Sequence, residues 1–159
     1  MNIFISYDRR DADLAMEVCE FVRDCNCNPV IDYDQNLPGD RWRKNMLEQL
    51  ENANAIILLL TVNSLTSKGT VQEEIRTALR LAAEDSTVLI PLLIDPIKLP
   101  ADIRSYQTEL WNGIGKANLR RKFVKMKDEI DAGLLTLGGL ALASAGLIYW
   151  MNKKKKKKP

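Results

Sequence analysis

The run AIILLLT (55–61) is apolar at every position until its closing threonine. A strand that is apolar throughout, rather than at alternate positions, is typical of a strand buried on both faces of a parallel sheet. Three further runs have β-like composition: NIFIS (2–6), PVIDY (29–33) and TVLIPLLI (87–94). QTELW (107–111) is a candidate for a last short strand. Pro91 interrupts the run 87–94, and it favours an edge position or an irregular strand because proline has no N–H for a neighbouring strand.

Segments with helical spacing separate these runs. They cover Asp11 to about Asp24, a stretch that begins after Asp40 as its N-cap, residues 71–84, and a final helix from Lys116. Strands that alternate with helices predict βαβ units and therefore a parallel sheet with right-handed crossovers.

Composition limits the chemistry that the chain can perform. The 159 residues are enough for one domain with a real core. Residues 1–131 carry 17 Lys and Arg against 21 Asp and Glu, so this part is mildly acidic and has no broad basic face for nucleic acid. The chain has no histidine, which excludes Ser-His and Cys-His nucleophile pairs and the commonest zinc ligand. Cys25-Asn-Cys27 can be interpreted as a metal or redox pair, but reduced thiols of a cytosolic protein are the better interpretation.

The C-terminal part has a different composition. Residues 132–151 contain no charged side chain, and at about 1.5 Å per residue they reach roughly 30 Å, the thickness of a bilayer core. Tyr149 and Trp150 lie at one end, as in an aromatic belt, and six lysines follow at 153–158. We therefore expect a domain at 1–131, a single transmembrane helix at 132–151 and a polylysine tail at 152–159. The lysines alone favour the opposite orientation, yet a tail-anchored arrangement with the domain facing the cytoplasm accounts best for the lack of an export signal.

Three common α/β families do not fit the chain. A dinucleotide-binding Rossmann fold needs a glycine-rich turn after the first strand, where this chain has FISYDRRD. No P-loop is present, and a phospho-receiver domain needs an acceptor aspartate at the position of Thr61.

A different family matches the whole layout. Four segments in order resemble a Toll/interleukin-1 receptor (TIR) domain of the bacterial, stand-alone kind, namely FISYDRRDADLA (4–15), VIDYDQNLPGDRWRKNMLEQLENANAIILLLTVNSL (30–65), SKGTVQEEIRTAL (67–79) and VLIPLLID (88–95). The resemblance implies a flavodoxin-like five-stranded parallel sheet flanked by helices. It also implies self-association through TIR–TIR contacts, with the loop DQNLPGD (34–40) completing a neighbour's site. The setting that it suggests is immune or cell-death signalling, with anti-phage defence if the source is bacterial.

One branch of this family cleaves NAD⁺ and releases nicotinamide, by hydrolysis, cyclisation or both. Its key residue is a glutamate at the start of the third helix, and a carboxylate there stabilises the oxocarbenium character that develops on the ribose. Glu74 is the matching residue because Ile75 and the apolar stripe follow it; Glu73 is the rival. Thr70 stands where many relatives have an aromatic residue. The alternative is that these acids merely suit a helix N-terminus, in a non-enzymatic adaptor that signals through TIR–TIR contacts at a membrane.

The resemblance also implies a set of substrate-binding residues around Glu74: Ser6, Tyr7, Asp8, Arg9, Trp42, Asn63 and Ser67. Arg9 or Arg10 is expected to pair with the pyrophosphate and Tyr7 to pack on a ring. Trp42 either stacks on adenine or anchors its helix, and Ser67 either binds substrate or caps the helix that follows. We expect no metal and no cofactor, since NAD⁺ is the substrate, and we expect membrane lipids as a further partner.

Overall fold

The structure analysed is a computed structural model, which describes residues 1–31, 39–67, 70–84 and 87–132. For residues 39–43 and 70 it describes the backbone only.

Five strands form one sheet in which every neighbouring pair is parallel. The strands are β1 (Asn2–Ser6), β2 (Asn28–Val30), β3 (Ala55–Leu60), β4 (Val88–Leu93) and β5 (Glu109–Leu110). Their spatial order is β2-β1-β3-β4-β5, which is the doubly wound order of flavodoxin-like folds. The predicted five-stranded parallel sheet with flanking helices is therefore confirmed.

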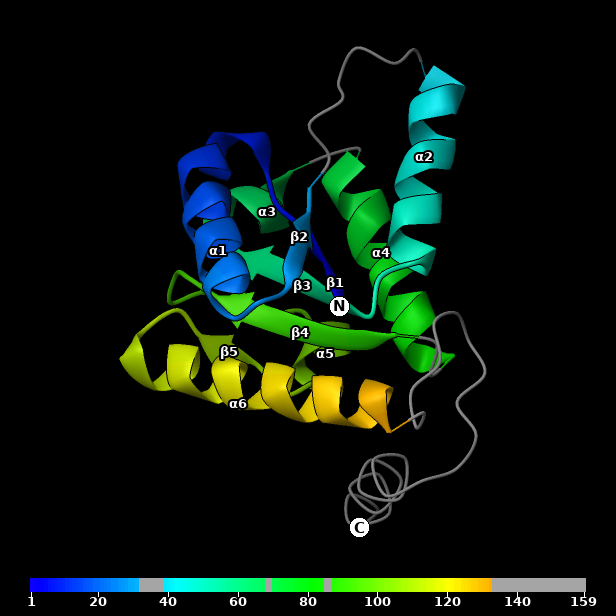
Figure 1. Cartoon of the computed structure of the whole chain (residues 1–159). Coiled ribbons are helices and arrows are strands. Elements are labelled where there is room, and N and C mark those ends of the chain that lie inside the picture. The colour runs from blue at the N-terminus through cyan, green and yellow to red at the C-terminus, as the bar shows by residue number, and fades with distance from the viewer. Residues whose placement is uncertain (32–38, 68–69, 85–86, 133–159) are drawn as a thin grey trace, which may run out of the picture.

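Helices cover both faces of the sheet (Figure 1). They are a 3₁₀ helix η1 (Arg9–Asp11), then α1 (Ala12–Asp24), α2 (Gly39–Glu51), α3 (Val62–Thr66), α4 (Thr70–Ala83), α5 (Ala101–Arg104) and α6 (Gly113–Asp131). Helices α1 and α6 pack on one face, and α2 and α4 pack on the other.

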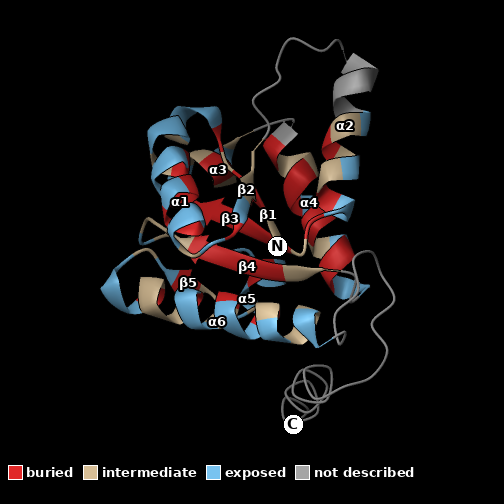
Figure 2. Ribbon diagram, viewed as in Figure 1, coloured by how far each residue is buried: buried red, intermediate tan, exposed pale blue. Residues whose placement is uncertain are grey.

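Strand β3 lies at the centre of both cores. All six of its residues are buried, and successive side chains alternate between the two faces. Ala55, Ile57 and Leu59 pack toward α1 and α6, whereas Ile56, Leu58 and Leu60 pack toward α2 and α4. The buried residues follow this strand and the inner sides of the helices (Figure 2). The unbroken apolar run is thus explained by two apolar environments, one on each side.

The position of β4 in the sheet tests the prediction made from Pro91. In strand order β4 is interior, so the predicted edge position is wrong for the strand as a whole. However, β5 pairs only with Leu92 and Leu93, while Pro91 has its register partner, Leu58, on the β3 side. The missing N–H of Pro91 is tolerated because no strand pairs with β4 at this position on its outer side.

Several boundaries differ from the sequence prediction. Strand β2 ends at Val30 rather than residue 33, and β5 has two residues rather than five. Helix α2 begins at Gly39, so Asp40 lies inside it instead of capping it. Helix α6 begins at Gly113, three residues early, because the Asn112 side chain accepts a hydrogen bond from the N–H of Gly115 at 2.9 Å and caps the helix. The short helices α3 and α5 were not predicted.

The predicted transmembrane helix falls outside the described residues, apart from Ala132. None of the helices in the described ranges combines the length and apolarity needed to cross a bilayer.

Helix α6 is held against β5 by a buried charged group and a close backbone approach. Glu109 is 3% exposed, and its carboxylate forms an ion pair with Lys122 at 2.6 Å and accepts from Asn118 at 3.1 Å. Gly115 faces the backbone of Leu110 so closely that an added Cβ would lie 1.8 Å from the Leu110 carbonyl oxygen. Only glycine fits this position without moving the helix.

We predict that Gly115→Ala destabilises the domain by about 2–3 kcal/mol, because the helix must shift away from β5 to relieve the overlap. Urea unfolding followed by circular dichroism measures the change. Gly113→Ala is the matched control, since an added Cβ there meets nothing within 4 Å. Equal stability of the two variants would contradict the close approach.

Candidate functional site

A buried hydrogen bond joins the end of β1 to α4. The Ser6 hydroxyl donates to Glu74 Oε2 at 2.6 Å, and the two residues are 2% and 5% exposed. Ser6 is the last residue of β1 and Glu74 lies in the second turn of α4, so the pair sits at the carboxyl edge of the sheet. Open α/β sheets bind ligands at this edge. The Ser6 hydroxyl fixes the orientation of the Glu74 carboxylate.

The two rival glutamates are in different environments. Glu74 is buried, whereas Glu73 is only partly buried and lies in the first turn of α4. Ile75 and Ala78, which follow on the same helix, are in the core between α4 and the sheet. The apolar stripe of α4 therefore turns Glu74, rather than Glu73, toward Ser6.

A second buried carboxylate, Asp8, lies in the segment after β1. It is 5% exposed and receives three hydrogen bonds from Arg10, at 3.0 Å from the backbone N–H, 2.7 Å from Nε and 3.0 Å from a terminal nitrogen. These bonds from Arg10 hold the pKa of Asp8 well below its usual range, against the opposing effect of burial, and a hydrogen bond with Ser67 adds to the lowering. Asp8 is therefore ionised at neutral pH.

The segment after β1 is also fastened to the end of β3. The Asp11 carboxylate accepts from the Thr61 hydroxyl at 2.6 Å and from the Asn63 side-chain amide at 2.7 Å. Arg10 donates a further hydrogen bond to the Asn63 carbonyl oxygen at 3.0 Å. These bonds hold the residues at the carboxyl edge of the sheet beside Glu74 in a fixed arrangement before any ligand binds. We call this group of residues, which spans β1, β3 and α3, the rim.

The predicted substrate-binding residues are not all brought together. Ser6 contacts Glu74 directly, whereas Asp8, Asn63 and Ser67 are joined to one another through Arg10 and Asp8. Ser67 is the C-cap of α3, and the start of α4 that it is predicted to cap follows residues 68–69, which lie outside the described part of the chain. The Asn63 side chain is held by Asp11, and Ser6 holds Glu74, so both have structural partners already.

Tyr7, Arg9 and Trp42 are placed differently. Tyr7 packs with the core under α1 and α6, on the opposite face of the sheet from Glu74. Arg9 is exposed in η1, and of the two arginines it is Arg10 that is bound to Asp8. Trp42 lies in α2, and its side chain is outside the described part of the chain.

Asp11, Thr61 and the pairing of Asp8 with Arg10 are parts of the rim that the sequence did not predict. A signal for Asp8 was present, because period-two alternation through FISYD places Ser6 and Asp8 on the same face and Tyr7 on the other. No comparable signal pointed to Asp11, since its partners, Thr61 and Asn63, lie about fifty positions away in the sequence.

Thiols and metal-ligating side chains are two further kinds of reactive group. Cys19, Cys25 and Cys27 are free thiols, and burial is the main reason that the pKa of each is raised. Within the described ranges no group of three or more His, Cys, Asp or Glu side chains is arranged to hold a metal ion.

Comparison with known proteins identifies the family. A family model described as a TIR domain matches residues 3–132. The chain belongs to the TIR domain family. No match is found among curated protein sequences.

Solved structures with similar folds include a TIR domain and two enzymes. The TIR domain of the Toll-related receptor TRR-2 from Hydra magnipapillata superposes with a TM-score of 0.63 at 16% identity, covering 79% of this chain and 97% of that one. A 2-deoxyribosyltransferase from Bacillus psychrosaccharolyticus gives 0.59 at 11% identity, with 79% and 96% covered. The CMP N-glycosidase BcmB from Clostridium botulinum gives 0.55 at 14% identity, with 79% and 98% covered. Because these sequence identities are low, the similarities show a shared fold only.

We predict that Asp8→Asn destabilises this TIR domain at neutral pH by about 2 kcal/mol, because hydrogen bonds between charged groups are lost at a buried position. The pKa of Asp8 is lower in the folded than in the unfolded state, so the stabilisation is present above the unfolded value of about 3.9 and is lost as the pH falls below it. The difference between wild type and variant should therefore shrink as the pH is lowered from 4 toward 2, as measured by urea unfolding at each pH.

The matched control is Asp13→Asn, an exposed aspartate in the first turn of α1. It should change the stability by no more than about 0.5 kcal/mol. A loss for Asp8→Asn that stays constant across this pH range would contradict the role given to ionised Asp8.

Proposed function

We propose that this TIR domain cleaves NAD⁺ at the bond between nicotinamide and ribose, with Glu74 as the catalytic carboxylate. The observation that carries the proposal is the buried hydrogen bond of 2.6 Å from Ser6 to Glu74 at the carboxyl edge of the sheet. The product is ADP-ribose in linear form, cyclic form or both. The setting we propose is immune or cell-death signalling.

The chemistry requires a fixed negative charge beside the ribose. Loss of nicotinamide leaves positive charge on the anomeric carbon and the ring oxygen, and a preorganised carboxylate stabilises that charge as it develops. Ser6 supplies a neutral donor, which orients Glu74 without cancelling its charge. Nicotinamide departs as a neutral molecule, so the reaction needs no strong general acid, and the absence of histidine is compatible with it.

The structural relatives support this proposal at the level of the fold. Two of them are named for the transfer of a deoxyribosyl group and for N-glycosidic cleavage of CMP. A fold similar to this one therefore occurs in proteins that are named for transfer or cleavage at a glycosidic bond of nucleosides or nucleotides. The extension to this chain rests on Glu74 and its surroundings.

The remaining parts of the proposal concern the assembled, membrane-bound state. Self-association through TIR–TIR contacts brings the loop 34–40 of one copy to the Glu74 rim of another. A transmembrane helix at 132–151 tethers the domain to a membrane on its cytoplasmic side and raises the local concentration that assembly needs.

We predict that Glu74→Gln lowers the rate of nicotinamide release from NAD⁺ by about 10²–10³-fold, because the charge that stabilises the transition state is lost. The rate is measured by chromatography on the full chain after assembly on lipid vesicles. Ser6→Ala should give a smaller loss, since Glu74 keeps its charge but loses the donor that orients it.

Glu73→Gln is the matched control, because it removes a neighbouring charge from the same helix and should leave the rate within a factor of about two. Thermal unfolding of each variant shows that it is folded. A loss with Glu73→Gln but not with Glu74→Gln would overturn the assignment. No nicotinamide release by the wild type in any assembled state would overturn the enzyme and favour the adaptor.

The membrane tether gives a separate prediction. The full chain should stay in the membrane pellet after extraction with alkaline carbonate, because a transmembrane helix is held by burial of apolar side chains and not by charge. A chain that ends at residue 131 should be released into the supernatant. Release of the full chain would show that residues 132–151 do not span the membrane.

A further inference from the structure

Helix α6 carries a concentration of positive charge in a domain that is otherwise acidic. Residues 116–127 contain six basic side chains and no acidic one. The six are Lys116, Arg120, Arg121, Lys122, Lys125 and Lys127. The rest of residues 1–131 holds 11 Lys and Arg against 21 Asp and Glu. A local excess of one sign of charge on one helix indicates a surface that binds a partner of the opposite charge.

Three of these six side chains fasten α6 to its neighbours. Lys122 is paired with the buried Glu109 at 2.6 Å, and Lys116 is paired with Glu17 of α1 at 3.0 Å. Lys127 donates to a backbone carbonyl oxygen at the end of α1, at 2.6 Å. Their charges act mainly within the domain, so the remaining three cations define what α6 offers to a partner.

The other three cations lie on the outer side of α6 and keep most of their charge. Arg120 and Arg121 are exposed, and neither forms an ion pair with a carboxylate of the described part of the chain. Lys125 is also exposed, with 62% of its side chain accessible, and its contact with the Glu129 carboxylate is long, at 3.8 Å. Exposed pairs of this kind contribute little energy, so the lysine is free to bind a stronger anion.

Two aliphatic side chains are exposed on the same side of the helix. Val124 is 59% exposed and Ile114 is 78% exposed. At 3.6 residues per turn, both fall on the side of α6 that bears the three exposed cations and faces away from the sheet (Figure 2). Cations beside exposed aliphatic groups are typical of a helix that lies on a membrane, where the charges bind lipid phosphates and the aliphatic groups enter the bilayer boundary.

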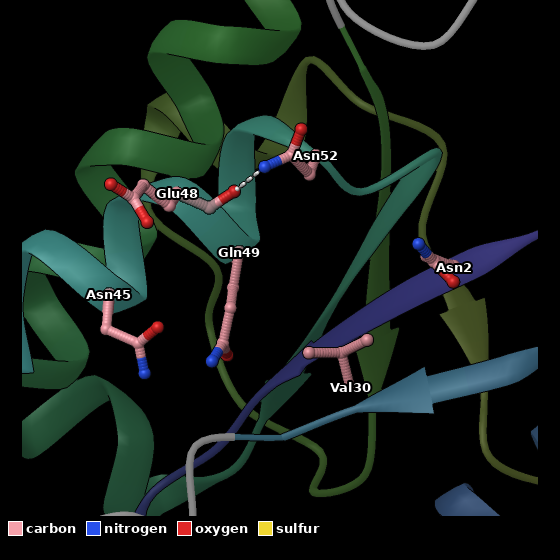
Figure 3. Close-up of a pocket in the computed structure, with 6 residues that line it drawn as sticks. All are labelled: Asn2, Val30, Asn45, Glu48, Gln49 and Asn52. Carbon is pink, nitrogen blue, oxygen red and sulfur yellow. Dashed lines mark hydrogen bonds between the residues drawn. The ribbon is translucent and has the colours of Figure 1, made fainter.

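The shape of this surface also suits a bilayer. The cavity of about 220 Å³ beside α2 lies on the opposite face of the sheet from α6 (Figure 3). The cations and aliphatic groups of α6 are instead spread along the outer side of a helix of 19 residues, about 28 Å long. A flat, extended partner can contact all of them at once.

The sequence that follows the domain identifies that partner. Helix α6 ends at Asp131, and the uncharged run for which a membrane span is proposed above begins at the next residue. A span that starts there brings the end of α6 to the bilayer surface, where anionic lipids attract basic side chains close to a span. The three acids of α6, at positions 128, 129 and 131, leave the helix with a net charge of +3.

We propose that the outer side of α6, formed by Ile114, Arg120, Arg121, Val124 and Lys125, is a docking surface for the anionic headgroups of a bilayer. The choice of a membrane rests on the tether proposed above, whereas cleavage of NAD⁺ does not enter the argument. Docking by α6 holds the domain in one orientation on the membrane. Because α6 and α4 pack on opposite faces of the sheet, the helix that carries Glu74 then lies on the side away from the lipid.

The test uses a chain that ends at residue 131, so that binding by α6 is measured without the span. The buried residues of both cores lie within 1–126, so this chain keeps all of them, and circular dichroism checks its fold. Binding is measured by co-sedimentation with vesicles of phosphatidylcholine, alone or with about 30% phosphatidylserine. We expect binding to the anionic vesicles only, weakened by added salt.

Substitutions test where the binding charge lies. Arg121→Gln combined with Lys125→Gln should weaken binding about tenfold or more, because two of the cations that contact the headgroups are lost. Lys44→Gln combined with Arg76→Gln is the matched control, since it removes the same charge from exposed positions on the other face of the sheet. It should leave binding within a factor of about two. Val124→Ser should weaken binding about threefold or more without any change of charge.

The full chain provides a second readout on lipid nanodiscs. Acetylation of Lys125, followed by mass spectrometry, should be slower on discs that contain phosphatidylserine than on neutral discs. Acetylation of Lys44, which is 79% exposed on α2, should be the same on both.

Three results would overturn the proposal. The first is no binding of the chain 1–131 to anionic vesicles, and the second is an equal loss for the two charge pairs, which would reflect net charge alone. The third is binding to duplex DNA as tight as to the vesicles together with no effect of Val124→Ser, which would identify a general polyanion surface. Failure of the tether is a different outcome: carbonate would release the full chain while the chain 1–131 still binds anionic vesicles.

Discussion

The burial of β3 on both faces is the constraint on which the rest of the structure depends. Six consecutive apolar residues cannot face water on either side, so helices must cover the sheet twice, and parallel strands joined by helices are the arrangement that achieves this. In such a sheet all the carboxyl ends lie at one edge. The position of the candidate site follows from that geometry, because Ser6, Thr61 and Glu74 all lie at this edge.

Alternation along β1 continues past the end of the strand and sorts the side chains that reach this edge. Ile3 and Ile5 pack toward α1 and α6, and Tyr7 follows them. Phe4 packs toward α2 and α4, and Ser6 continues on that side to reach Glu74. The local period of two therefore separates a residue that supports the core from one that orients the carboxylate, even though the two are adjacent in the sequence.

The sequence predicted those elements whose hydrophobic pattern is long and lies within one segment of the chain. The apolar run of β3 and the stripe of α4 predicted the sheet and distinguished Glu74 from Glu73, because each is a property of one segment. The two-residue β5 and the five-residue α3 carry too few residues to show a period, and they depend on pairing with β4 and on the cap formed by Thr61. The same limit applies to the rim: the partners of Arg10 and Asp11 are on α3 and at the end of β3, so only the folded chain reveals them.

The two buried carboxylates at the rim, Asp8 and Glu74, are held in different ways. Asp8 is bound by the guanidinium of Arg10, which compensates its charge and ties it to α3. Glu74 accepts a hydrogen bond from the hydroxyl of Ser6, a neutral group that restrains its orientation. A carboxylate already paired with an arginine has little attraction left for a developing cation, so Asp8 is poorly suited to stabilise one. The pairing with Arg10 thus makes Asp8 a structural anchor of the rim, whereas the role proposed for Glu74 rests on its burial at the carboxyl edge of the sheet and on its orientation by Ser6.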